Sequence, residues 1–151
     1  MKQCLIMQKI KEYNLYEFTG SNDSRFRPLV EIIGNNFKPK ELINWLENEK
    51  STANATEWVY VRKENGGISL YDVSDSMDET YTGEYLNPEK CFTMTIQNFS
   101  EIILQWEQLR ITRPDIMLIV IHEDDHVSLE SDPAIIKEYQ DAGYGYNLET
   151  R

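Results

Sequence analysis

The chain has 151 residues, of which 40% are hydrophobic and 27% charged, a composition typical of one globular domain with its own apolar core. Its 15 Lys and Arg stand against 26 Asp and Glu, so the formal net charge is −11. Nucleic acids and anionic membranes bind proteins through Lys and Arg, and we therefore expect neither as a partner.

The N-terminal part of the chain predicts a strand followed by two helices. The first eighteen residues are rich in strand-favouring side chains and end at the turn-forming cluster Thr19–Asp23. A short apolar helix is expected from Pro28 to the stop at Gly34. Pro39 then begins a second helix at its first turn.

The middle of the chain predicts a β-hairpin. Apolar and polar side chains alternate over Glu57–Lys63, and a second apolar run covers Ile68–Val73. Between them lies Asn65-Gly66-Gly67, whose residues adopt the positive φ angles that tight hairpin turns require. Residues 74–89 are expected to form an irregular loop, and Cys91–Ile96 alternates as a further strand.

An amphipathic helix and a buried strand follow. The helix is expected to open at Ser100-Glu101, with Asn98 or Ser100 as its N-cap, and to end before Pro114. The run Ile116–Ile121 is apolar throughout, which indicates a central strand buried on both faces.

The chain is then expected to turn at Asp124-Asp125, to continue as a strand through Val127 and Leu129, and to end in a helix over Pro133–Ala142. This order of elements predicts the α+β class, with a mainly antiparallel sheet and helices packed on one face. We expect a single domain over residues 1–151, of which residues 143–151 form a flexible tail. The three tryptophans lie on apolar faces and are expected in the core: Trp45, Trp58 and Trp106.

The cysteines and apolar runs predict a cytoplasmic protein. Cys4 and Cys91 are too few for a disulfide framework, and we expect both to be reduced thiols. The apolar run Cys4–Met7 is shorter than the core of a signal peptide, and Ile116–Ile121 is far too short to span a membrane.

Charge is distributed unevenly along the chain, which predicts an acidic binding face. Residues 1–40 carry 7 Lys and Arg against 4 Asp and Glu, whereas residues 41–151 carry 8 against 22. Two stretches, 72–89 and 115–132, hold six acids each and no Lys or Arg. Carboxylates interleaved with tyrosines suit the binding of a cationic protein partner, because tyrosines anchor interfaces and charge accelerates association. The predicted contact residues are Tyr71, Asp72, Asp75, Asp78, Glu79, Tyr81, Glu84, Tyr85, Glu123, Asp124 and Asp125.

One stretch matches a catalytic pattern. His122-Glu123-Asp124-Asp125-His126 fits H-E-x-x-H, in which two histidines on one helix face bind zinc and the glutamate acts as a base. The stretch follows a predicted strand and contains a predicted turn, so a solvated hairpin tip is the favoured interpretation. We find no nucleophile elbow and no phosphate-binding glycine loop, and we expect neither an enzyme nor a cofactor or metal.

The region from Phe92 to Asp132 carries a resemblance to a known class of proteins. Its succession of features is a strand, the helix start Asn98-Phe99-Ser100-Glu101-Ile102-Ile103, then Gln105-Trp106-Glu107-Gln108-Leu109, Pro114-Asp115, the apolar strand, the Glu123-Asp124-Asp125 turn and Val127-Ser128-Leu129-Glu130. This succession resembles small cytosolic immunity proteins of bacterial polymorphic-toxin systems, including those of contact-dependent inhibition. The resemblance implies a non-enzymatic inhibitor that binds a cognate toxin domain, often a nuclease, and supplies no catalytic residues.

Charge and resemblance together favour an immunity protein that neutralises a basic, nuclease-like toxin domain. A nuclease cleft is basic because it holds phosphate, and an acidic loop can occupy it as a phosphate mimic. Two alternatives remain open: an adaptor or regulatory domain with another protein partner, and, less favoured, a metal-dependent hydrolase using His122 and His126. Homodimerisation through the tyrosine-rich strands is also compatible with the sequence.

Overall fold

The computed structural model describes residues 3–9, 16–19, 27–30, 32–33, 38–55, 59–72 and 91–142. The strands in these ranges are β1 (Gln3–Lys9), β2 (Tyr16–Thr19), β3 (Ala53–Ala55), β4 (Val59–Glu64), β5 (Gly67–Asp72), β6 (Cys91–Thr95), β7 (Ile116–Ile121) and β8 (Val127–Glu130). The helices are α1 (Arg27–Val30), α2 (Pro39–Glu47), α3 (Ile96–Thr112) and α4 (Pro133–Asp141).

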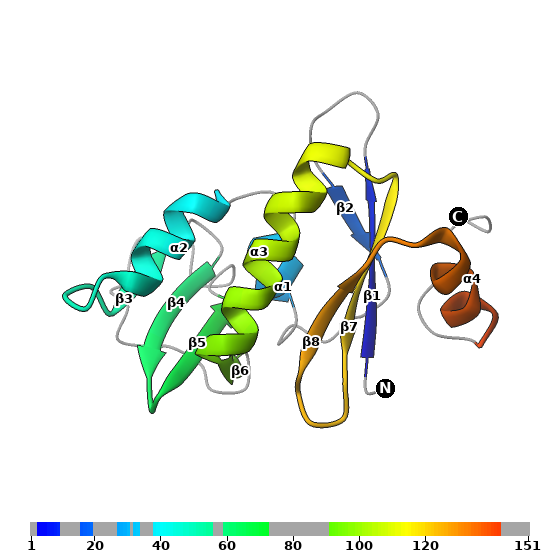
Figure 1. Cartoon of the computed structure of the whole chain (residues 1–151). Helices are drawn as coiled ribbons and strands as arrows, with labels where there is room; N and C mark the ends of the chain where they lie inside the picture. Colours follow the sequence, from blue (N-terminus) through cyan, green and yellow to red (C-terminus); the bar gives the residue numbers. More distant parts are fainter. Residues whose placement is uncertain are drawn as a thin grey trace, which may run out of the picture.

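The described strands form two four-stranded sheets, in which every pairing is antiparallel. One has the order β2-β1-β7-β8 and the other the order β3-β4-β5-β6. The two sheets lie side by side, and α3 runs across their junction (Figure 1). The predicted α+β class and the antiparallel pairing are confirmed, although the strands divide between two sheets. The strands form two sheets because α3 follows β6 without a loop, and β7, the next strand along the chain, pairs with β1 and not with β6.

A single large core joins the two sheets. It is built from the inner faces of β4–β8 together with the apolar sides of α2 and α3 and the buried side chains of Leu29, Ile32 and Ile33. Trp45 and Trp106 belong to this core, as predicted, with 7% and 4% of their surfaces exposed. Trp58 lies outside the described residues.

Strand β7 is buried on both faces, as its apolar sequence predicts. Because side chains alternate along a strand, Ile119 and Ile121 face the main core whereas Leu118 and Val120 face the other way. There α4 covers them with Ile136, and Figure 1 shows the strands of this sheet between α3 and α4. Helices therefore pack on both faces of this sheet and not on one, because an entirely apolar strand needs cover on each side.

The start of α3 corrects one detail of the sequence prediction. The helix begins at Ile96, and its N-cap is Thr95, whose hydroxyl accepts a hydrogen bond of 3.0 Å from the backbone N–H of Asn98. Neither Asn98 nor Ser100 is the cap. The end of the helix agrees with the prediction, because α3 ends at Thr112 and Arg113 forms a left-handed C-cap just before Pro114.

Two tight turns close the hairpins β4–β5 and β7–β8. Asn65 and Gly66 have φ angles of 54° and 75°, and this pair of positive φ angles confirms the predicted turn. Gly67 is required for another reason, since a Cβ there would lie 2.8 Å from the carbonyl oxygen of Met94. In the second hairpin Asp125 takes the positive φ angle, 67°.

Some predictions fall on parts of the chain outside the described residues. These include the whole of the 74–89 loop and the predicted tail at residues 143–151. Among the described helices, none is both long and apolar enough to cross a membrane.

Candidate functional site

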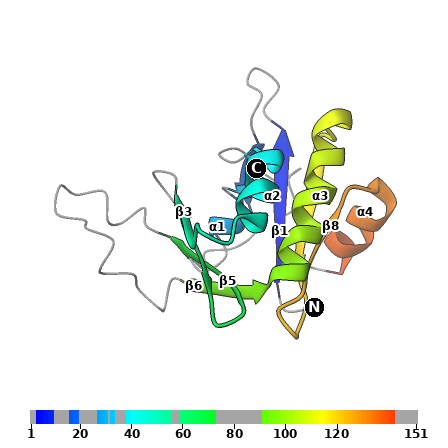
Figure 2. The same cartoon turned by 60° about the vertical axis from the view of Figure 1, so that its left-hand side comes forward.

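A groove of about 600 Å³ lies between the tips of the two hairpins. Its walls are Glu64–Ser69 of the β4–β5 hairpin and Asp124–His126 of the β7–β8 hairpin, and its floor is Thr93–Thr95 with Asn98. We call it the hairpin groove. Figures 1 and 2 show both tips directed to the same end of the molecule, with the start of α3 between them.

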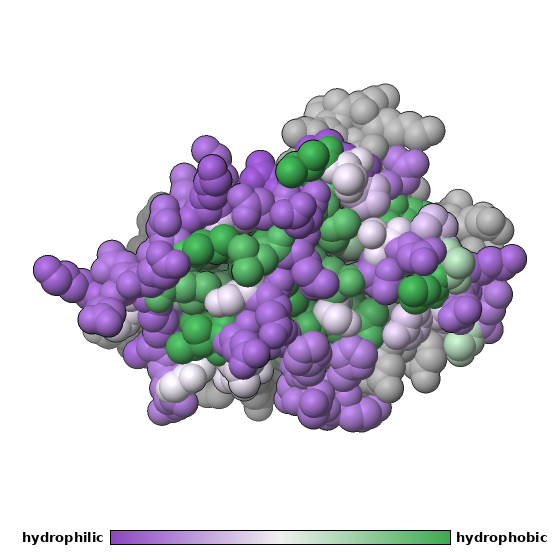
Figure 3. Space-filling model, in the orientation of Figure 1, coloured by the Kyte–Doolittle hydropathy of each residue, from purple (hydrophilic) through white to green (hydrophobic). Residues whose placement is uncertain are grey.

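The hairpin groove is acidic. Glu64, Asp124 and Asp125 line it, and no Lys or Arg does so among the residues that the structure describes. Glu123 is exposed on the same tip. Figure 3 shows a continuous hydrophilic surface over the tip of the β7–β8 hairpin. Carboxylates that line one concave surface attract cations and repel anions.

The carboxylate of Glu64 is held in place by a hydrogen-bonded cluster on β4 and β5. The Tyr71 hydroxyl donates a hydrogen bond of 2.8 Å to Oε1 of Glu64, and Arg62 Nε lies 3.5 Å from Oε2. Hydrogen bonds from Ser69 and Tyr71 keep the pKa of Glu64 below its usual value, so the group is ionised at neutral pH. Burial, aided by the hydrogen bond to Glu64, raises the pKa of Tyr71.

Cys91 lies beside this cluster and carries a free thiol. Its side chain is half-buried, and burial raises the pKa of the thiol.

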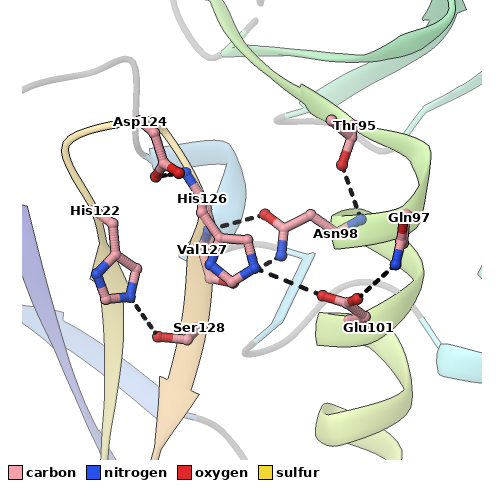
Figure 4. Close-up of polar contacts among 9 residues, drawn as sticks. All are labelled: Thr95, Gln97, Asn98, Glu101, His122, Asp124, His126, Val127 and Ser128. Atoms are coloured by element: carbon pink, nitrogen blue, oxygen red, sulfur yellow. Dashed lines mark hydrogen bonds and ion pairs between the residues drawn. The ribbon is translucent and has the colours of Figure 1, made fainter.

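Asn98 fixes the β7–β8 hairpin against α3. Only 4% of its surface is exposed, and its amide donates a hydrogen bond of 2.8 Å to the carbonyl of Val127. The side-chain oxygen of Asn98 accepts a second bond, also 2.8 Å, from the N–H of Val127 (Figure 4). These contacts anchor the hairpin next to its tip and so set one wall of the groove.

His122 and His126 lie across the turn of the β7–β8 hairpin. The N–H of His122 donates to the carbonyl of His126 at 2.8 Å, so the H-E-x-x-H stretch is a hairpin, as predicted, and not a zinc-binding helix. The ring centroids are 5.7 Å apart. Each ring has its own polar neighbour: His122 Nε2 lies 3.0 Å from the hydroxyl of Ser128, and His126 Nε2 lies 3.6 Å from a carboxylate oxygen of Glu101 (Figure 4).

Within the described part of the chain, no three His, Cys, Asp or Glu side chains converge in an arrangement that could hold a metal ion. The hairpin geometry accounts for this at His122 and His126. Their two rings are engaged with different neighbours, Ser128 and Glu101, and do not point to a shared centre.

The structure brings together only some of the predicted contact residues. Glu123, Asp124 and Asp125 lie on one tip, and Tyr71 lies in β5, half-buried and bonded to Glu64. Asp72 ends β5. The other predicted contacts lie outside the described residues: Asp75, Asp78, Glu79, Tyr81, Glu84 and Tyr85.

The sequence reasoning missed Glu64, Asn98 and His126 as residues of the groove. Glu64 directly precedes the Asn65-Gly66 turn, so the sequence places it at a hairpin tip. Nothing in the sequence indicates that the two tips are neighbours.

No protein-family model, curated protein or solved structure significantly matches this chain.

Proposed function

We propose that this protein is a non-enzymatic, immunity-type inhibitor that binds a basic, nuclease-like toxin domain through the hairpin groove. The observation that carries the proposal is the convergence of Glu64, Asp124 and Asp125, from two separate hairpins, on a concave surface without Lys or Arg among its described residues. A surface of this sign is complementary to a cleft that binds phosphate.

Rigidity supports this function. An inhibitor loses less conformational entropy on binding when its contact groups are already fixed. Glu64 is held by Tyr71, and the opposite wall is anchored through the contact of Asn98 with Val127. The net charge of −11 would also steer a cationic partner and raise its rate of association.

A cytoplasmic location is part of the proposal, because an inhibitor of this type acts where its toxin would act. The free thiol of Cys91 is compatible with a reducing compartment.

Affinity capture from a lysate of the source organism, followed by mass spectrometry, tests the proposal. A triple variant, E64Q/D124N/D125N, removes three negative charges from the groove while keeping the size of each side chain. A control variant, E49Q/E138Q/D141N, removes three charges from exposed positions outside the groove lining.

We expect the wild type and the control to retain one basic protein in stoichiometric amount, and the groove variant to lose most of it. The purified partner should cleave nucleic acid, and the wild type should inhibit this cleavage. Equal retention by the groove variant and the control would contradict the assignment of the groove. Recovery of the bait alone from cells that express its neighbouring genes would contradict the immunity function.

A further inference from the structure

A second hollow, of about 490 Å³, lies between the first turn of α2 and the last turn of α3. Its described lining includes four cationic residues: Lys38, Lys40, Arg110 and Arg113. We call it the basic pocket. The 17 residues of α3 span about 25 Å, so the basic pocket and the hairpin groove lie near opposite ends of this helix.

The basic pocket concentrates positive charge in a strongly acidic chain. Four of the 15 Lys and Arg line it, while the whole chain carries a net charge of −11. Glu41 and Glu107 also belong to its lining, so the described part of the lining carries an excess of positive charge. Lys38, Lys40 and Arg110 form no ion pair with another residue that the structure describes.

Folding alone does not account for the lysines of the pocket. The N-terminus of a helix carries a partial positive charge, where anionic side chains stabilise the helix and cations destabilise it. Lys38 nevertheless occupies the N-cap position of α2 and makes no capping hydrogen bond, and Lys40 follows in the first turn. Residues that weaken a local element without a visible structural gain commonly serve a function.

The arginines of the pocket differ from the lysines, because their positions at the end of α3 stabilise that helix. Arg110 lies in the last turn of α3, and Arg113 is its C-cap. Cations there interact favourably with the helix dipole. Because α2 packs antiparallel to α3, the start of α2 lies beside the end of α3. The two lysines of α2 and the two arginines of α3 therefore line the same basic pocket.

An exposed apolar side chain indicates what kind of anion the pocket fits. Ile111 lies in the lining with 78% of its surface exposed, and Leu104, two turns earlier on α3, is 51% exposed. Among the residues that the structure describes, the lining contains neither an aromatic side chain on which a nucleobase could stack nor a glycine loop that could hold phosphate. A protein segment offers both carboxylates for the cations and an apolar side chain for Ile111.

We propose that the basic pocket binds an acidic, partly apolar segment of a partner protein. The carboxylates of this segment pair with Lys40 and Arg110, and one of its apolar side chains covers Ile111. This interaction surface is separate from the hairpin groove, has the opposite charge, and does not depend on what the groove binds.

Fluorescence anisotropy of the full chain with a labelled peptide of alternating Glu and Leu residues tests the proposal. The variant K40E/R110E should weaken the peptide affinity about tenfold, because two favourable ion pairs become repulsive contacts. The control K50E/K137E makes the same change in net charge at exposed positions outside the pocket and should bind as the wild type does. Thermal unfolding of each variant checks that the fold is intact.

The variant I111S tests the apolar contact without changing the charge, and it should weaken binding by about threefold through loss of buried apolar area. Equal affinities for K40E/R110E and K50E/K137E would overturn the assignment of the pocket. An unchanged affinity for I111S would overturn the apolar contact. Binding of a short single-stranded DNA, but not of the peptide, in a manner sensitive to K40E/R110E would overturn the choice of a protein segment.

Discussion

The side-chain amide of Asn98 forms two hydrogen bonds of 2.8 Å with the main chain of Val127, one as donor and one as acceptor. Val127 begins β8, which lies at the edge of the sheet and has β7 as its one neighbour among the described strands. The amide thus takes the place that a peptide group of a further strand would occupy. It satisfies backbone groups that a bare edge would leave open to another chain.

Replacing Asn98 by Ala should destabilise the protein by about 2–4 kcal/mol, because two buried backbone groups of Val127 lose their hydrogen bonds. Denaturant unfolding of N98A against the wild type measures this loss. The variant Q97A, at an exposed position in the same helical turn, is the control and should change stability by less than about 0.5 kcal/mol. Similar losses for N98A and Q97A would contradict the role of the amide.

Lys63 makes a second long-range connection, between β4 and the end of α2. Its ammonium group donates hydrogen bonds to the carbonyl oxygens of Trp45, Asn48 and Ser51, at 2.5, 2.8 and 2.9 Å, and lies 4.6 Å from the centre of the Trp45 ring. We expect K63M to destabilise the protein by about 1.5–3 kcal/mol, as is usual for bonds to a charged group.

Amide hydrogen exchange distinguishes the loss of the Lys63 contacts from a general effect of the lost charge on stability. In K63M the amides at the end of α2 and in the following turn should exchange faster, because their anchor to β4 is lost. The exposed K50M should leave exchange there unchanged. Uniform acceleration across the whole chain, without preference for this region, would contradict a local anchoring role for Lys63.

Local features of the fold were predictable from the sequence. The turn at Asn65-Gly66 follows from the φ angles that these residues tolerate, and the burial of Ile116–Ile121 on both faces follows from its lack of polar side chains. Pro114 and Pro133 indicated helix boundaries, because proline restricts the backbone conformation of its own residue and of the residue before it.

Features that depend on distant residues were not predictable. Asn98 is a favourable N-cap residue, but its amide is engaged by Val127, 29 positions away, and Thr95 caps α3 instead. The division into two sheets depends on the pairing of β7 with β1 at the other end of the chain. The hairpin groove was only half predictable, because Asp124 and Asp125 belong to a recognisable turn whereas the proximity of Glu64 results from tertiary packing.

The contact between Tyr71 and Glu64 predicts a measurable change in acid titration. Hydrogen bonds from Ser69 and Tyr71 lower the pKa of Glu64 from its usual 4.5, so their stabilising effect is present above this pH and is lost as the pH falls through the lower, folded-state pKa. In Y71F the pKa of Glu64 should rise towards 4.5, because one of these bonds is removed. Carbon-13 NMR of the Glu64 carboxyl group measures the shift. An unchanged pKa would show that Tyr71 does not stabilise the carboxylate.

The N-terminus of α2 offers a test in which stability and binding change in opposite directions. In K38D an acceptor side chain replaces a cation at an N-cap that lacks a side-chain hydrogen bond, and an aspartate there also suits the helix dipole. We expect the free energy of unfolding to rise by about 1 kcal/mol. The same change removes one cation from the basic pocket and adds an anion, so it should weaken binding of the acidic peptide.

The matched variant K50D makes the same change of charge at an exposed position outside the basic pocket and should affect neither helix capping nor peptide affinity. A gain in stability accompanied by unchanged peptide binding would mean that Lys38 serves no purpose in the pocket. A loss of stability in K38D would mean that the lysine itself supports the start of α2. The combination of higher stability and weaker binding is the result expected if this end of the helix was selected for contact with a partner at a cost to the fold.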